Sequence, residues 1–141
     1  MKIDLAKLSD IFAQAPFVAD LGIVPTEAAD GHVCSRLVLQ PRHLQHTGVV
    51  HAGVMVTMAD HSMGAAAQSL APEGYFVLTA ELSTQLLRAA QGEALECEAR
   101  VLKPGRQVCF TEADVYALQG ERRVHVARAS ATMALLASRP G

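Results

Sequence analysis

The chain has 141 residues, of which 50% are hydrophobic, a length and composition typical of one compact domain with a substantial core. Its 12 basic residues nearly balance its 14 acidic residues, so the overall charge predicts neither nucleic acid nor a membrane as a partner. We expect a single domain over residues 1–141, with an N-terminal helix over 1–16 and a core over 17–137.

The first segment has the spacing of a short amphipathic helix. Before Pro16 ends the pattern, five apolar residues recur at near-helical intervals: Ile3, Leu5, Leu8, Ile11 and Phe12. Asp4 and Asp10 interrupt these residues, so the segment predicts neither a signal peptide nor a membrane span. The three cysteines, Cys34, Cys97 and Cys109, lie in apolar stretches and lack the spacing of metal ligands. This predicts buried free thiols in a reducing cytoplasm.

A hairpin and one long helix are expected next. Asp30-Gly31 is a typical hairpin turn, and it separates two strand-like runs near residues 22–29 and 32–39. A polar loop follows. A helix then extends from about His51 to Leu70, where an Ala-Pro-Glu-Gly run breaks it.

Four strand-like runs complete the chain, over residues 75–90, 93–105, 106–120 and 122–137. Short turns between successive runs favour antiparallel pairing of runs that are neighbours in the sequence. The alternation in the last run slips once after Val126, which indicates either a bulge or an error in the assigned register. The predicted fold class is α+β.

A carboxylate stands among apolar residues on the long helix. It belongs to a narrow stripe of polar or small residues, which consists of Thr57, Asp60, His61, Gly64 and Gln68. Apolar residues cover most of the remaining circumference of the helix. Burial of an unpaired carboxylate costs several kcal/mol, roughly, so Asp60 needs either a structural partner or a chemical task. The small side chains of the stripe favour close approach of a second copy of the helix, in a dimer.

The start of this helix has no Ser, Thr, Asp or Asn immediately ahead of it. Its first backbone N–H groups either polarise a carbonyl oxygen of a ligand or are capped by water or by Thr47, and both alternatives stay open. Asp60 lies eight residues beyond Ala52, about 12 Å along the helix axis, so one helix does not bring both groups to one reacting atom. Two antiparallel helices in a two-fold dimer do.

These residues resemble the acyl-CoA thioesterases of the hot-dog fold, in the branch typified by the phenylacetate-pathway thioesterases. The resemblance rests on the spacing of four features, namely Gln45, Gly48, His51-Ala52-Gly53 and Met58-Ala59-Asp60. It also rests on the order of elements from about Phe17 to Leu136. It implies an antiparallel sheet wrapped around the long helix, pairing into dimers and often tetramers, and hydrolysis of the thioester of coenzyme A conjugates.

The resemblance also implies a role for each position. Asp60 is expected to be the general base or the nucleophile, and the N–H of Ala52, with that of Gly53, to polarise the thioester carbonyl. His51 would shape the start of the helix, and Thr79 would orient the water or the carboxylate. Gln45 stands where the family has an Asn that contacts the attacking water or substrate; Ala52 replaces the family's first Gly.

No metal or separate cofactor is expected, because coenzyme A enters as part of the substrate. The candidate cations for its phosphates, near strand ends and in a turn, are Arg88, Lys103 and Arg106. Ordinary surface charge explains each of them equally well. A metal held by His43, His46 and His51 is a minor alternative, since no Cys or acidic ligand lies near them in the sequence.

Two other functions remain as alternatives. A hot-dog hydratase or dehydratase would pair a loop His, here His46, with the acid on the helix, but the Pro-rich loop of such enzymes is missing. A non-catalytic acyl-CoA-binding protein would keep the pocket without turnover, and Gln45 in place of Asn keeps that hypothesis open. A Ser or Cys acyl-enzyme is disfavoured, because Ser62 lacks a Gly-x-Ser-x-Gly turn and no Cys has a base beside it.

Overall fold

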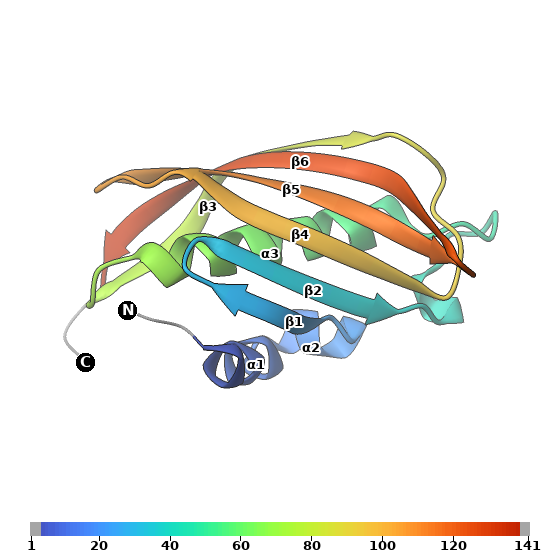
Figure 1. Ribbon diagram of the computed structural model, residues 1–141, viewed down its shortest axis with the longest axis horizontal. Coiled ribbons are helices and arrows are strands. Elements are labelled where there is room, and N and C mark those ends of the chain that lie inside the picture. Colours follow the sequence, from blue (N-terminus) through green and yellow to red (C-terminus); the bar gives the residue numbers. More distant parts are fainter. Residues whose placement is uncertain (1–3, 139–141) are drawn as a thin grey trace.

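A computed structural model describes residues 4–138 as one curved sheet packed against a long helix (Figure 1). The helices are α1 (Leu5–Gln14), α2 (Pro16–Leu21) and α3 (Ala52–Leu70), with a short 3-10 turn at Pro41–His43. The strands are β1 (Val24–Ala29), β2 (His32–Val38), β3 (Tyr75–Leu86), β4 (Ala94–Lys103), β5 (Val108–Gln119) and β6 (Arg122–Ala137). They form an antiparallel sheet in the order β1-β2-β4-β5-β6-β3. This confirms the predicted α+β hot-dog fold.

The core lies between α3 and the inner face of the sheet. The helix buries mainly Met and Ala side chains, of which Met58, Ala59, Met63 and Ala66 have no exposed surface. Small alanines let the helix approach the strands closely, and the flexible methionines fill the remaining space. On the sheet, every second residue of β5 turns inward against this face, which anchors the helix that carries Asp60.

The predicted slip in the last strand is a bulge. Val115 pairs with Ala127 and Tyr116 pairs with His125, so Val126 is the extra residue on β6. A bulge bends its strand and increases the local twist, which suits a sheet that curves around a helix. The hypothesis of a register error is therefore excluded.

The expected pairing of β3 with β4 is wrong. β3 instead adds to the far edge of the sheet, where it pairs with β6. The segment between β3 and β4 is not a hairpin turn: the N–H groups of Leu87 and Arg88 bond to the carbonyl of Val126, and Ala90 accepts the N–H of Val50. These bonds hold the chain as it passes the ends of β6 and β5 to reach β4, a path that a turn dipeptide in the sequence does not reveal.

The N-terminal segment contains two helices where one was predicted. Asp4 caps α1 by accepting the Lys7 N–H at 2.8 Å, and Leu8 and Phe12 face the core; Ile3 lies outside the described residues. Pro16 ends this helix but also occupies the first turn of α2, a position that tolerates its missing N–H. None of the described helices is long and apolar enough to cross a membrane.

The three cysteines are free thiols, as predicted, but Cys34 is only half-buried. Burial raises the pKa of Cys97 to about 12. Burial and the neighbouring charge of Glu27 raise the pKa of Cys34 to about 11, and burial also raises the pKa of Cys109. Un-ionised thiols are poor nucleophiles, which agrees with the expectation that no cysteine forms an acyl-enzyme.

Candidate active site

The start of α3 is capped by the side chain of His51. His51 has an extended backbone, and its Nδ1 accepts the Gly53 N–H at 2.9 Å. An imidazole nitrogen thus replaces the usual hydroxyl or carboxylate oxygen of a helix cap. The inference that the sequence supplies no cap here is therefore wrong, and Thr47 is not the residue that supplies it.

Ala52 keeps an unused backbone donor in this turn. The N–H of Val54 donates to the carbonyl of His51 at 3.0 Å, and the N–H of Gly53 donates to its ring. Within residues 4–138, the N–H of Ala52 has no acceptor. Gly53 therefore has no free N–H to offer a carbonyl oxygen, against the expectation from the resemblance, whereas Ala52 does.

A surface hollow lies beside this helix start. It is bordered by the first turn of α3, by α2 and by the loop before α3, and it is lined by Phe17, Leu21, Arg42, Leu44, His51, Gly53, Val54 and Thr57. Gln45 lies in the same loop, in a tight turn in which its carbonyl accepts the N–H of Gly48 at 2.9 Å. The hollow gives a ligand access to the helix start.

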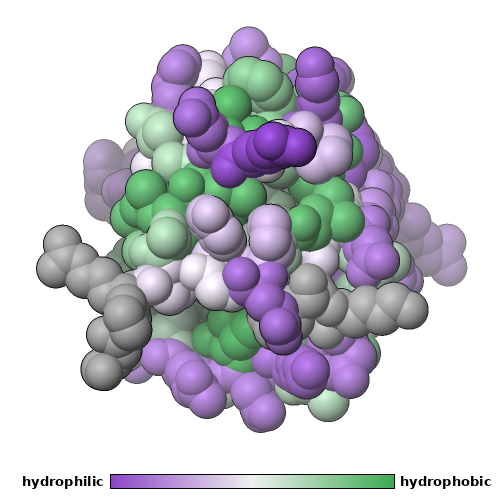
Figure 2. Space-filling view, turned by 90° about the vertical axis from the view of Figure 1, so that its left-hand side faces the viewer, coloured by the Kyte–Doolittle hydropathy of each residue, from purple (hydrophilic) through white to green (hydrophobic). Residues whose placement is uncertain are grey.

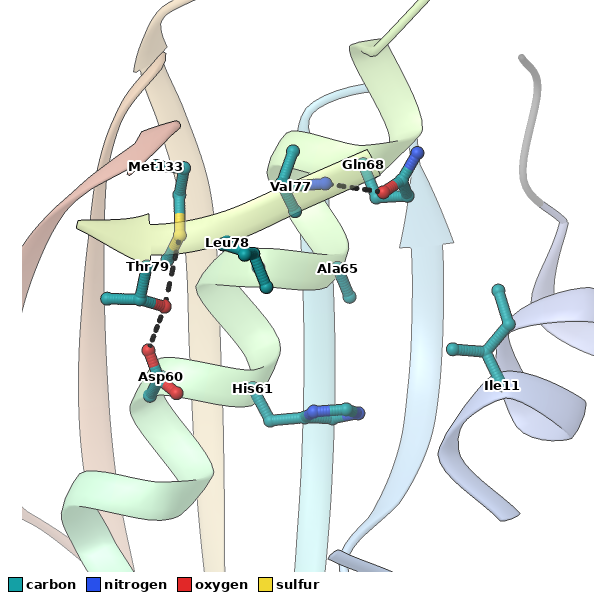
Figure 3. Close-up of a pocket in the computed structure, with 10 residues that line it drawn as sticks. Ile11, Asp60, His61, Ala65, Gln68, Val77, Leu78, Thr79 and Met133 are labelled. Carbon is teal, nitrogen blue, oxygen red and sulfur yellow. Dashed lines mark hydrogen bonds between the residues drawn. The ribbon is translucent and has the colours of Figure 1, made fainter. Parts of the chain in front are cut away.

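Asp60 lies in a different cavity, two helical turns away. The hydroxyl of Thr79 on β3 donates to Asp60 Oδ1 at 2.6 Å, and its Oγ1 lies 3.4 Å from Met133 Sδ (Figure 3). The structure thus brings the predicted pair Asp60 and Thr79 together across 19 residues of sequence. Because Thr79 fixes one carboxylate oxygen, the other stays available to accept a proton from water.

The cavity beside Asp60 has a volume of about 300 Å³. Residues from α1, α3, β3 and β6 line it: Ile11, Asp60, His61, Gly64, Ala65, Gln68, Val77, Leu78, Thr79 and Met133 (Figure 3). Four members of the predicted polar stripe of α3 line this cavity, whereas Thr57 lines the hollow at the helix start; all five are half-buried. Sequence reasoning missed Ile11, Val77 and Met133, because apolar residues on three separate elements carry no sign of a shared cavity.

His61 points away from Asp60, towards α1 (Figure 3). Its ring meets Phe12 edge to face, with centroids 4.3 Å apart, and its Nε2 is buried without a hydrogen-bond partner in the described chain. Burial lowers the pKa of His61, although the charge of Asp60 opposes this effect. A neutral imidazole packed on Phe12 agrees with the expectation that His61 is not the catalytic partner of Asp60.

The candidate cations for coenzyme A do not form one cluster in the protomer. Arg88 donates to the carbonyl of His125, near the beginning of β4, whereas Lys103 and Arg106 lie at its other end. His125 pairs with Tyr116, which pairs with Glu96, so Arg88 lies level with Glu96, and seven residues of β4, about 23 Å, separate that position from Lys103. A single phosphate is therefore out of reach of all three within one chain.

The histidines of the loop do not form a metal site. His43 is buried, its Nδ1 accepts the Gln40 N–H, and its Nε2 lies 2.7 Å from the carbonyl of Leu21. His46 is exposed in the loop and makes no hydrogen bond to Asp60. Among the described residues, the ligand atoms of Glu27, His32 and Cys34 do gather within 4.8 Å of one another, but on the outer face of the β1–β2 hairpin.

Comparison with known proteins gives a consistent result. Residues 47–124 match the family model described as "Thioesterase superfamily". The chain is 33% identical to a thioesterase family protein from Silicibacter pomeroyi, with a TM-score of 0.90 over 93% of this chain and 96% of that one.

Two further relatives share less of their sequence with the chain. It is 28% identical to the Caenorhabditis elegans protein named "Putative esterase F42H10.6" over 84% of this chain and 69% of the relative. A Bacillus halodurans protein, whose structure contains CoA, is also 28% identical, with a TM-score of 0.68 over 73% of this chain and 66% of that one. The family match covers more than half of the chain, so the protein belongs to the thioesterase superfamily and is a thioester hydrolase.

Proposed function

We propose that the protein hydrolyses the thioester of acyl-CoA substrates, with a site shared between the two subunits of a homodimer. The carboxylate of Asp60 from one subunit activates a water molecule or attacks directly, and the N–H of Ala52 from the other polarises the thioester carbonyl. The observation that carries the proposal is the separation of these groups on one helix: the carboxylate bonded to Thr79 and the unused donor at the helix start border different hollows.

The two groups have complementary chemistry for acyl transfer. Negative charge develops on the carbonyl oxygen as water adds to the thioester, and a backbone N–H at a helix N-terminus stabilises that charge. Among residues 4–138 the N–H of Ala52 has no acceptor, whereas the N–H groups of Gly53 and Val54 are bonded to His51. A base must lie within hydrogen-bond reach of the attacking water, and Asp60 is oriented for this by the Thr79 hydroxyl.

The edge strand β3 supports the dimer. It is the outer strand of the sheet, so within the described part of the chain one side of its backbone pairs with no strand, and none of its 12 residues is a proline. Nine of those residues are exposed, including Tyr75, Phe76, Leu78 and Leu86. Gln68 already bonds the carbonyl of Tyr75 and the N–H of Val77, and the remaining edge from Leu78 to Leu86 is a template for pairing with another strand. A second β3, antiparallel across a two-fold axis, would continue the sheet and bring the two α3 helices together.

Exposed apolar side chains are also visible at the end of the molecule where β3 begins and where β4 joins β5 (Figure 2). At this end lie Leu102, Phe110 and Leu136, each between 40% and 56% exposed. An apolar surface of this kind favours further association, and we propose that the dimers pair into tetramers. Recognition of coenzyme A is supported by the CoA found in the related Bacillus halodurans protein.

The decisive experiment replaces Asp60. Asp60→Asn removes the base while keeping the size of the side chain, and we expect kcat for acyl-CoA hydrolysis to fall by about 10²–10⁴-fold. Thiol release from short-chain, medium-chain and aryl-CoA esters measures it. Asp10→Asn, an exposed carboxylate on α1, is the matched control and should match the wild type.

The same assay separates the alternatives. Asp60→Asn activity within a few-fold of the wild type would contradict the proposal. Hydration of an enoyl-CoA without thiol release would identify a hydratase instead, and tight binding of acyl-CoA without turnover would identify a binding protein.

A further inference from the structure

Gly64 leaves an open space inside the Asp60 cavity. A Cβ built on Gly64 meets no atom within 4 Å, and the backbone there has an ordinary helical conformation that accepts any side chain. Gly64 lies one turn beyond Asp60 on the same stripe, about 6 Å further along the axis. The absent side chain therefore keeps the cavity open beyond the carboxylate.

Gln68 closes the cavity one turn further on. Its Nε2 donates to the carbonyl of Tyr75 at 3.0 Å, and its Oε1 accepts the N–H of Val77 at 3.1 Å (Figure 3). Both ends of the amide are thereby fixed to the backbone of β3, so this side chain is a rigid wall. The distance from Asp60 to Gln68 along the helix is about 12 Å.

The walls between these two residues carry no positive charge. None of the described residues that line the cavity is a lysine or an arginine, and His61 turns its ring towards Phe12. The remaining wall is mostly apolar, and Ile11, Val77 and Met133 contribute to it from three elements besides α3. A second carboxylate on the acyl group would face Asp60 with no counter-ion among these lining residues, and like charges placed together repel each other.

We propose that this cavity binds the acyl chain and that Gly64 determines its length, so that the substrates are uncharged acyl groups of medium length. This inference rests on the proposed function. An extended chain advances about 1.3 Å per bond, so an acyl group with its carbonyl beside Asp60 passes Gly64 near its fifth carbon and reaches Gln68 near its tenth. The volume agrees, since 300 Å³ holds about ten atoms of the size of water.

The test is a set of Gly64 variants assayed against saturated acyl-CoA esters from two to twelve carbons. For the wild type, kcat/KM should increase with chain length up to about ten carbons and then fall. Gly64→Val should lower the ratio of kcat/KM for octanoyl-CoA to that for acetyl-CoA by about tenfold or more, and Gly64→Ala by less. The control is Ala6→Val, on an exposed face of α1 outside the cavity, which should leave the ratio unchanged.

Charge is tested with two esters of equal chain length. Butyryl-CoA should be hydrolysed at least about tenfold more efficiently than succinyl-CoA, because only the second places a carboxylate against the uncharged wall. Equal efficiency would contradict the inferred preference for uncharged groups.

Three results would overturn the inference. A wild type that hydrolyses no acyl-CoA would refute the proposed function and this inference with it. An active wild type whose Gly64→Val variant loses activity equally at every chain length would refute the acyl site alone. Dissociation of the Gly64→Ala and Gly64→Val dimers, measured by light scattering, would assign the open space to the subunit interface.

Discussion

His61 couples the stability of the protein to pH. Its ring is packed between α3 and Phe12, and burial lowers its pKa below the ordinary value of 6.5. At a pH between the pKa of His61 in the folded protein and its ordinary pKa, the unfolded chain binds a proton on His61 that the folded chain does not bind. The free energy of unfolding therefore falls as the pH decreases through 6.5 towards the folded pKa.

We expect this loss to be smaller in His61→Phe, which removes the titratable group but keeps a ring against Phe12. Urea unfolding at pH 7.5 and pH 5.5 measures the difference between the two proteins. His46→Gln, a change at an exposed loop residue, should keep the wild-type response. An identical pH response of His61→Phe and the wild type would show that protonation of His61 does not oppose folding.

At the scale of one element, α3 offers a substitution that removes a single hydrogen-bond donor. Ala52 is the first residue of the helix, where proline is well tolerated, and the extended backbone of His51 (φ −62°, ψ 134°) is compatible with a following proline. Ala52→Pro should therefore fold normally. It should lower kcat by about 10²–10³-fold, because one oxyanion donor is lost.

Circular dichroism and thiol release measure the two halves of that prediction. The matched control is Ala52→Ser, which keeps the N–H and should keep most of the activity. A folded Ala52→Pro enzyme with wild-type kcat would rule out the N–H of Ala52 as a catalytic donor.

The sequence predicted the elements better than their arrangement. Helical spacing located α3 to within a residue, and the alternation in the last strand located a slip after Val126, which the structure shows to be a bulge. The position of β3 was wrong, because pairing with β6 depends on where α3 returns the chain and on the bonds made by residues 87–90. A turn dipeptide in the sequence contains no information about such distant contacts.

The same limit applies to the candidate site. Family resemblance selected Asp60 and Thr79, which do contact each other. It also selected Gly53 as a donor, and the structure shows this N–H bound to His51, because the capping use of an imidazole is too rare to predict from residue type. The cavity around Gly64 is formed by residues of four elements that are distant in the sequence, so no local sequence pattern predicts it.

At the scale of the whole molecule, the shared site makes a quantitative prediction for mixed dimers. Asp60→Asn and Ala52→Pro each disable both sites of their own homodimer. In a heterodimer of the two, one site receives both defects and the other receives the intact Asp60 and the intact Ala52. Random pairing of equal amounts should therefore restore about a quarter of the wild-type activity.

Unfolding and refolding an equimolar mixture, followed by the thiol-release assay, measures this recovery. Each variant treated alone is the control and should stay inactive. If the mixture is no more active than the single variants although heterodimers form, each site lies within one subunit and the shared-site proposal fails.

The three thiols have a consequence for anyone who follows this enzyme with a chromogenic disulfide. With a pKa of about 11, roughly one Cys34 side chain in ten thousand is a thiolate at neutral pH, and Cys97 and Cys109 are sequestered in the core. The thiols of the native protein therefore react very slowly with such a reagent, and the absorbance change measures the coenzyme A that hydrolysis releases. Once the chain opens, the same dye titrates three equivalents per polypeptide, so one reagent distinguishes turnover from denaturation.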